Sequence, residues 1–463
     1  DVCSSDLNPS NAGQYRTPDG WADFAHRESI IEVAGSAPVT ISLQWTVNGP
    51  VIPSDQYNLG TIRPPGHVTT VSWTALDPAD TTMTAAMRVM RAATIDEALA
   101  AGELYIAPAQ MLTLADRNRV AIRLIGRMPV RDDGSLTQGR MPSLGYVAAN
   151  RWQGFFPYAD NPGVIDPVGG IVGHTNNRVT DAPFPRHVSF TWGDSQRIQR
   201  WSFLMQQREV HSRDSFIEAQ LDTVSQAARN LLPLVGADLW FTGESAPEGT
   251  PEQRRQEALA LLAEWNGEMN EHLPEPLIYA AWMRALQDRL IRDELGPLAD
   301  AFARVQPLFI ERVYRDTDGA AVWCDVLQSA PVETCTDIAR LALDDALVWL
   351  GDAYGTTLQS LRWGDAHVAV QDHTVLGATP ILNWIVNIHQ PTSGDDDTLM
   401  RGMTRASGPR PFENVHGAGY RGVYDFADPD SSVFIIATGQ SGHPLSRFYD
   451  DLGSLWRRGE YIP

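Results

Sequence analysis

The sequence predicts an α+β fold in which two strand-rich segments flank a mostly helical insertion. Residues 8–207 carry short apolar runs and period-two alternation separated by turn signals, and residues 356–463 return to that pattern. Residues 208–355 instead repeat apolar side chains at the spacing of amphipathic helices. Because few helical patterns separate the strands, we expect a large antiparallel sheet that both ends of the chain complete as one domain.

The first strands are predicted from alternation and from the turn that closes it. Residues 39–47 alternate with period two and end at Asn48-Gly49-Pro50, and residues 30–33 form an apolar run before them. Residues 71–76 are predicted to form another strand, which carries Trp73.

Two helices and a hairpin are predicted next along the chain. Residues 81–91 and 94–101 have helical patterns, and the second places Asp96 and Glu97 in its first turn. Residues 111–115 and 120–124 are predicted to pair as a hairpin around a polar turn.

The helical insertion is predicted from apolar stripes, which we interpret as core faces rather than cofactor-binding surfaces. The predicted helices span residues 215–232, 251–265, 277–295 and 335–350. After Trp363 the strand pattern returns, with a buried run at residues 433–437 preceded by residues 422–424. The acidic run at residues 393–397 predicts a solvated loop.

Charge and hydropathy argue against two kinds of partner. The 463 residues include 57 acidic and 36 basic side chains, which give a net charge of −21. A nucleic-acid partner is not expected, because phosphate binding needs a basic face. No apolar run is long enough to span a bilayer, so no membrane partner is expected.

Residues 1–7, Asp-Val-Cys-Ser-Ser-Asp-Leu, match the conceptual translation of a common sequencing-library adapter. We therefore expect them to be non-native, with the natural sequence continuing upstream, so that the lack of a signal peptide carries no information. Cys324 and Cys335 then remain. They form either a disulfide in an oxidising compartment or two reduced thiols, and the sequence leaves both open.

A first candidate for chemistry is the stretch 169–185. Two glycines lead into a short apolar run that is predicted to be a strand ending at Asn176-Asn177. A side-chain amide held at a strand end can donate hydrogen bonds to a developing oxyanion. The alternative is that Asn176 and Asn177 only shape a turn, because Asn tolerates left-handed backbone angles.

Other catalytic patterns are weak. The sequence has no Gly-x-Ser-x-Gly elbow, and Ser441 in Gly439-Gln440-Ser441-Gly442 is the nearest approach, with His443 or His416 as its base. A tight structural turn is the favoured interpretation of that segment. His367 and His373 are six residues apart, a spacing that fits no zinc pattern.

Several separated blocks, in the same order along the chain, resemble the penicillin acylase (penicillin amidase) family of N-terminal-nucleophile hydrolases. They include Tyr15-Arg16-Thr17-Pro18-Asp19-Gly20-Trp21, Arg151-Trp152-Gln153-Gly154-Phe155-Phe156-Pro157, Asn176-Asn177, Glu264-Trp265-Asn266-Gly267-Glu268-Met269, Trp363-Gly364-Asp365-Ala366-His367, and Gly439-Gln440-Ser441-Gly442-His443-Pro444. The resemblance covers nearly all of residues 8–463. It implies an αββα sandwich, here incomplete, with a mostly helical insertion.

The resemblance also implies a mechanism and site residues. In the family, a precursor cuts itself into two subunits, and the new N-terminal Ser of the large subunit attacks an amide with its own α-amine as base. The family's oxyanion-donating Asn falls on Asn176. Its positioning Arg falls on Arg197, for which a surface salt bridge is the alternative, and Trp73 falls in the acyl pocket, for which an ordinary core Trp is the alternative.

The resemblance implies no cofactor for the chemistry, is compatible with a structural calcium ion, and places the protein in the periplasm or outside the cell. The expected substrate is a linear amide, such as the acyl side chain of a β-lactam or an acyl-homoserine lactone.

One departure from the family pattern concerns the nucleophile. Ser10-Asn11 imitates the start of the family's large subunit but lacks the Trp two residues on. We therefore expect that the small subunit, the nucleophile and most calcium ligands lie outside this chain, which would then be inactive alone and expose apolar surface. The alternatives are a catalytically inactive binding or structural homologue and a serine hydrolase that uses Ser441.

Overall fold

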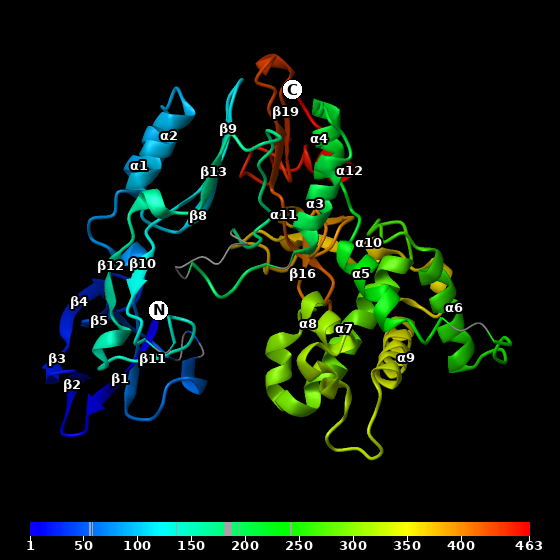
Figure 1. Ribbon diagram of the computed structural model, residues 1–463, viewed down its shortest axis with the longest axis horizontal. Helices are drawn as coiled ribbons and strands as arrows, with labels where there is room; N and C mark the ends of the chain where they lie inside the picture. The colour runs from blue at the N-terminus through cyan, green and yellow to red at the C-terminus, as the bar shows by residue number, and fades with distance from the viewer. Residues whose placement is uncertain (55–56, 58, 136, 180–187, 194, 241–242) are drawn as a thin grey trace. The chain divides into compact units, whose positions relative to one another are not determined.

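The computed structural model describes residues 1–54, 57, 59–135, 137–179, 188–193, 195–240 and 243–463. The chain divides into two compact units, Asp1–Gly193 and Asp194–Pro463, and each is described by itself (Figure 1).

The first unit is built on an antiparallel sheet with the strand order β3-β2-β1-β7-β6-β5-β4. A further strand, β11 (Ser143–Leu144), pairs in parallel with β1. The strands are β1 (Val2–Asn8), β2 (Asn11–Thr17), β3 (Gly20–Asp23), β4 (Ala25–Ile31), β5 (Val39–Thr46), β6 (Gly49–Ile52) and β7 (His67–Val71). Strand β1 includes most of the residues we ascribed to an adapter. That origin stays a prediction, which the nucleotide sequence of the locus tests.

The β4–β5 hairpin confirms the alternation predicted for residues 39–47. Its pairing is continuous from Ala25 opposite Trp45 to Ile31 opposite Val39. The apolar run predicted at residues 30–33 instead ends as a strand at Ile31, because the chain turns away before Val39. Ile30 is 66% exposed, so this edge of the sheet presents apolar side chains.

Two smaller sheets and two helices complete the first unit. The predicted hairpin is confirmed as β8 (Gln110–Ala115) and β9 (Val120–Ile125), which β13 (Gly163–Ile165) extends. Strands β10 (Pro129–Arg131) and β12 (Trp152–Phe155) form the other sheet. The helices are confirmed as α1 (Thr82–Val89) and α2 (Ile95–Ala101). The Thr94 hydroxyl caps the N-terminus of α2 by accepting a hydrogen bond from the Glu97 amide.

The strand predicted for residues 71–76 is wrong. Strand β7 ends at Val71, and a single 3₁₀ turn, η2 (Thr74–Leu76), follows it. Trp73 is the extended residue before that turn. The apolar run therefore marks a strand end and a turn rather than a continuous strand.

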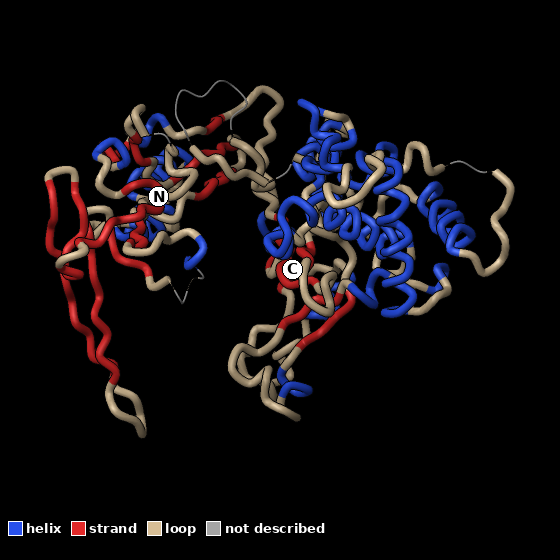
Figure 2. Tube along the Cα trace, turned by 90° about the horizontal axis from the view of Figure 1, so that it is seen from below, coloured by secondary structure: helices blue, strands red, loops and turns tan. Residues whose placement is uncertain are grey.

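The second unit is mainly helical, and Figure 2 shows its helices as a blue group. Helix α7 (Glu275–Leu295) is buried on most of its faces because its residues, among them Trp282 and Leu286, lie in one large apolar core. The helices of the first part of this unit are α3 (Gln196–Gln206), α4 (Arg213–Gln220), α5 (Gln226–Val235), α6 (Pro251–Glu264), α7 (Glu275–Leu295), α8 (Pro307–Tyr314) and α9 (Cys335–Tyr354), with the 3₁₀ segments η6 (Gly296–Phe302) and η7 (Thr317–Cys324).

Three of the four predicted helices in this segment are confirmed as α6, α7 and α9, but the helix predicted for residues 215–232 is wrong. It divides into α4 and α5, and the link between them contains Asp222 and Ser225. The Ser225 hydroxyl accepts a hydrogen bond from the Ala228 amide and so starts a new helix. The helical spacing of apolar residues continues across this boundary. It therefore does not reveal that one helix ends and a second begins after the Ser225 N-cap.

The last part of the chain returns to strands, as predicted. One sheet has the order β15-β14-β17-β16 and a second pairs β18 with β19. No described sheet combines strands from both ends of the chain. The strands near the N-terminus pair in the sheets of the first unit, and those near the C-terminus pair in the two sheets named here. The elements are α10 (Trp363–Ala366), β14 (Val368–Gln371), α11 (Asn383–Val386), β15 (Ile388–Pro391), β16 (Gly402–Thr404), β17 (Asn414–Gly417), β18 (Tyr420–Val423), β19 (Val433–Ile436) and α12 (Gly453–Arg458).

Covalent and ionic links hold the second unit together. Cys324 and Cys335 form a disulfide, which resolves the alternative that the sequence left open. Arg200 pairs with Asp222 through two hydrogen bonds. The sequence contains no lysine, so every described ion pair has an arginine or a histidine as its cation.

Candidate active site

Asn176 lies in a bend and not at a strand end, so the strand predicted to follow Gly169 and Gly170 and to end at Asn176-Asn177 is wrong. Gly169 and Gly170 have φ values of 100° and 67°, and the Gly170 amide donates to the Pro167 carbonyl oxygen. These left-handed conformations reverse the chain where a strand would need extended backbone. Asn176 has a φ of 65°, which Asn tolerates better than most residues.

The imidazole of His174 holds this turn from both sides. Its Nδ1 accepts from the Asn176 amide at 3.3 Å and its Nε2 lies 3.2 Å from the Asn177 carbonyl oxygen. Because Nδ1 accepts, the proton of the neutral ring sits on Nε2, which then donates to Asn177. The Gly193 amide donates to the Asn176 carbonyl oxygen, and a Cβ on Gly193 would lie 3.1 Å from that oxygen.

The two adjacent amides have different surroundings. The Asn177 side chain accepts from the Thr175 amide at 3.0 Å and donates to the Arg178 carbonyl oxygen at 2.9 Å. Asn176 is exposed. A side-chain NH₂ is the kind of donor that an oxyanion requires, and the amide of Asn177 helps to build the turn. The rest of the candidate stretch, residues 180–187, lies outside the described residues.

Arg197 is the second residue of α3 and belongs to the other unit. Burial lowers the pKa of its guanidinium, as does the nearby charge of Arg401, whereas the carboxylates of Asp397 and Asp396 act in the opposite sense. One turn further on, Arg200 makes its two-bond pair with Asp222 and fixes the helix. Arg197 therefore lies in a charged, half-buried environment rather than on an open surface.

Trp73 is exposed over 55% of its surface in the first unit. An ordinary core Trp, the alternative weighed for this residue, would be buried. The exposed indole is compatible with a role in contacting a substrate or another chain, and its assignment to an acyl pocket stays a prediction.

Ser441 lines a cleft of about 430 Å³ in the second unit, together with Asp372, His373 and Tyr449. Its hydroxyl accepts from the backbone amide of His443 at 3.2 Å. The Nδ1 atom of that histidine accepts from the Leu445 amide instead of contacting the hydroxyl. The local geometry is that of a Ser-nucleated turn, as the sequence favoured.

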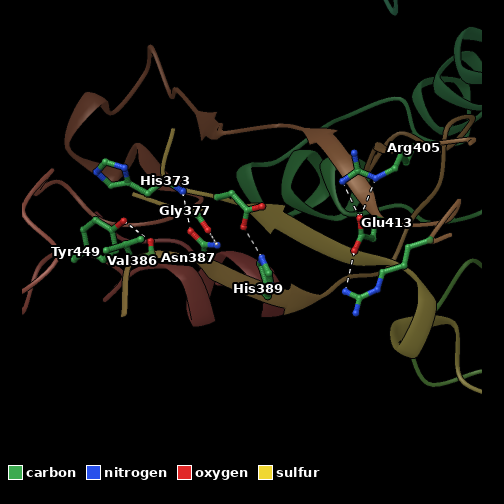
Figure 3. Close-up of polar contacts among 10 residues, drawn as sticks. His373, Gly377, Val386, Asn387, His389, Arg405, Glu413 and Tyr449 are labelled. Atoms are coloured by element: carbon green, nitrogen blue, oxygen red, sulfur yellow. Dashed lines mark hydrogen bonds and ion pairs between the residues drawn. The ribbon is translucent and has the colours of Figure 1, made fainter. Parts of the chain in front are cut away.

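Figure 3 shows the polar contacts around this cleft. The Asn387 side chain accepts from the His373 amide and donates to the Gly377 carbonyl oxygen, and Tyr449 donates to Val386. His389 pairs with Asp372 at 2.6 Å. These contacts tie the loop after β14 to α11 and β15, and they give two cleft side chains, Asp372 and Tyr449, structural partners.

His367, one of the two histidines noted in the sequence, is a core residue. Its ring stacks on Trp363 with the ring centroids 4.7 Å apart. Its two nitrogens lie 2.8 Å and 2.9 Å from the carbonyl oxygens of Thr392 and Gly402. Burial lowers the pKa of this imidazole.

The acidic run at residues 393–397 is not a solvated loop, so that prediction is wrong. Asp395 is only 7% exposed, and Asp396 pairs with Arg304 and accepts from Thr404. Because cations and N–H donors occupy these carboxylates, they do not fit a calcium site. No group of three or more metal-ligating side chains occurs in the described part of the chain. The calcium ion stays a prediction from the resemblance.

No helix among the described residues is both long and apolar enough to cross a bilayer. The fold itself is that of an N-terminal-nucleophile hydrolase. It matches a thermostable penicillin G acylase from Alcaligenes faecalis with a TM-score of 0.72 at 17% sequence identity, over 100% of this chain and 82% of that one.

The family model for penicillin amidase matches residues 1–463, so the chain belongs to the penicillin amidase family. It is 27% identical to the penicillin acylase 2 proenzyme of Pseudomonas sp. (strain SE83), over 99% of this chain and 56% of that protein. It is 23% identical to the acyl-homoserine lactone acylase QuiP of Pseudomonas aeruginosa, over 97% of this chain and 56% of that protein. The chain thus spans a little over half the length of these relatives.

Proposed function

We propose that this chain is part of the large subunit of an acylase that hydrolyses linear amides. The observation that carries the proposal is the penicillin amidase match over the whole chain, together with relatives named as penicillin and acyl-homoserine lactone acylases. The proposed substrate is a linear amide, such as the acyl side chain of a β-lactam or an acyl-homoserine lactone.

In the proposed mechanism, an N-terminal Ser from a segment outside this chain attacks the amide carbon and passes its proton to its own α-amine. The carbonyl oxygen becomes an oxyanion, and the side-chain NH₂ of Asn176 donates to it. The C–N bond then breaks and the amine leaves with the proton. Water hydrolyses the resulting ester, which releases the carboxylic acid and restores the Ser.

We propose further that the complete enzyme is a processed heterodimer exported to the periplasm or beyond. The Cys324–Cys335 disulfide supports export, because such bonds persist in oxidising compartments. The exposed apolar side chains of β4 and β5 support an additional covering chain, since large exposed apolar patches mark contact surfaces.

The test compares this 463-residue chain with the complete gene product on a phenylacetyl amide and an acyl-homoserine lactone. We expect hydrolysis only by the complete enzyme. In that enzyme, Asn176→Asp keeps the size and tolerates the left-handed backbone but removes the NH₂ donor. We therefore expect a loss of about 10²–10³ in kcat, with little change in KM.

Asn177→Asp is the matched control, because that amide serves the turn, and we expect it to change kcat by less than about tenfold. Turnover by the 463-residue chain alone would contradict the proposal, as would full activity of Asn176→Asp. If the complete product is folded but inactive, the protein is a binding or structural homologue instead.

A second candidate is a serine hydrolase that uses Ser441, favoured by its place in a cleft with His373 and Asp372. Ser441→Ala in the complete enzyme decides between the two. Retained activity supports the N-terminal nucleophile, and abolished activity in a folded variant supports Ser441.

A further inference from the structure

A cleft in the second unit is lined by residues of α7, η6 and α9 and has a volume of about 590 Å³. That volume falls within the range of small-molecule binding sites. None of its lining residues belongs to the proposed hydrolytic site. A ligand bound here would therefore act apart from the amide chemistry.

The polar side of the cleft carries three arginines from α7, and two of them are neutralised. Arg289 pairs with Asp345 at 2.6 Å, and Arg292 pairs with Asp300 at 2.9 Å and also with Asp288.

Arg284 differs from the other two arginines. Its Nε donates to the Ala406 carbonyl oxygen at 3.4 Å, and no carboxylate among the described residues pairs with it. A guanidinium presents five N–H donors in a plane, so the terminal N–H groups of Arg284 remain available to the cleft.

The apolar side of the same cleft is aromatic. Trp349 and Phe412 meet edge to face with their ring centroids 5.6 Å apart. Phe302 also lines the cleft and is 55% exposed. A cleft whose lining combines aromatic side chains with one guanidinium that has no carboxylate partner among the described residues is suited to a ligand with an apolar body and an anionic end.

We propose that this cleft binds a small organic monocarboxylate with an aromatic or aliphatic body. The carboxylate would pair with Arg284 through two hydrogen bonds, and the body would pack on Trp349, Phe412 and Phe302. Because Arg289 and Arg292 are already paired with aspartates, the cleft offers one guanidinium, which matches one carboxylate rather than a multiply charged anion such as a phosphate. This inference does not depend on the proposed hydrolysis.

The test measures binding to the 463-residue chain by isothermal titration calorimetry. Naphthalene-2-carboxylate is the probe, and naphthalene-2-methanol is its uncharged counterpart. We expect saturable binding of one carboxylate and weaker binding of the alcohol. Arg284→Gln should weaken carboxylate binding about tenfold or more and leave the alcohol unaffected. Arg315→Gln, whose exposed ion pair with Glu311 lies outside the cleft, is the control and should bind normally.

Ser407→Phe provides a second, independent variant. Ser407 is an exposed residue of the cleft lining, so a larger side chain there should fill the space without disturbing the core. We expect it to abolish binding of both probes while circular dichroism stays unchanged. The proposal is overturned if the wild-type chain shows no saturable binding, if it binds both probes equally, or if folded Arg284→Gln binds normally. If Arg284→Gln does not fold, unchanged binding by Ser407→Phe overturns it.

Discussion

Asp395 is a carboxyl group placed inside the second unit rather than at its surface. Its Oδ1 accepts from the Asp397 amide at 2.8 Å. Burial raises its pKa to about 7, with a further contribution from the neighbouring Asp396 carboxylate, while hydrogen bonds from Asp397, Ser225 and Thr398 oppose the rise. At mildly acidic pH this side chain is therefore protonated in the folded protein.

This raised pKa predicts how stability depends on pH. The unfolded carboxyl titrates near about 3.9, so between about pH 4 and 7 the folded state holds a proton that the unfolded state has lost. This residue's contribution to stability therefore falls as pH rises through that window. Asp395→Asn mimics the protonated form and should raise Tm at pH 8, with a smaller rise at pH 4.

The measurement is thermal unfolding of both proteins from pH 4 to 8. Asp430→Asn is a control, because Asp430 lies in the exposed turn η9 (Pro429–Ser431). A difference in Tm between wild type and Asp395→Asn that does not change with pH would contradict the prediction.

Asp395 and Asn176 show the limit of what residue patterns can predict. The acidic run at residues 393–397 suggests solvent, yet its partners Ser225 and Arg304 come from distant parts of the chain. Residue type and context indicate Asn176 as a candidate, but its left-handed backbone depends on a turn held by His174 and Gly193. Such partners are set by tertiary packing, which a local pattern does not contain.

At the scale of elements, the disulfide joins the end of η7 to the start of α9 and closes a short loop. A cross-link over about 12 residues should stabilise the fold by about 3 kcal/mol through the unfolded chain. We expect Cys324→Ser with Cys335→Ser to lower the free energy of unfolding by about that amount, measured in urea. Dithiothreitol should destabilise the wild type and leave the double variant unchanged, and equal unfolding midpoints would contradict the prediction.

Helices could be predicted better than strands because α6, α7 and α9 each bury a long periodic face in one core. The strand predictions for residues 71–76 and for the run that ends at Asn176-Asn177 are wrong, and in both places the apolar run is short. In both places a turn follows within a few residues, and glycine or turn geometry decides the backbone. Short apolar runs do not distinguish a strand from the end of one.

At the scale of the whole molecule, the second unit has a core of its own. The apolar cluster runs from Ala228 to Phe412, and all of its described residues belong to the second unit. We therefore expect residues 195–463, expressed alone, to be helical and to unfold cooperatively. Far-UV circular dichroism during urea unfolding measures this, and a broad transition without a baseline would contradict it.

The α+β class and the family fold could be predicted from the sequence, the first by periodicity and the second by resemblance. The composition changes after Arg197, close to the division between Gly193 and Asp194, whereas the helical pattern begins only near residue 208. Contacts between distant segments, rather than composition, define a compact unit.

The absence of lysine, which leaves arginine as the main cation of the ion pairs, has a practical consequence for handling the protein. Without lysine, amine-reactive dyes, N-hydroxysuccinimide esters and aldehyde-activated supports have no side-chain amine to attack. Carboxylate coupling or an introduced thiol is needed for immobilisation. The same pairs, including Arg200–Asp222 and Arg255–Asp344, keep their positive partner in alkaline buffers where a lysine would lose its proton.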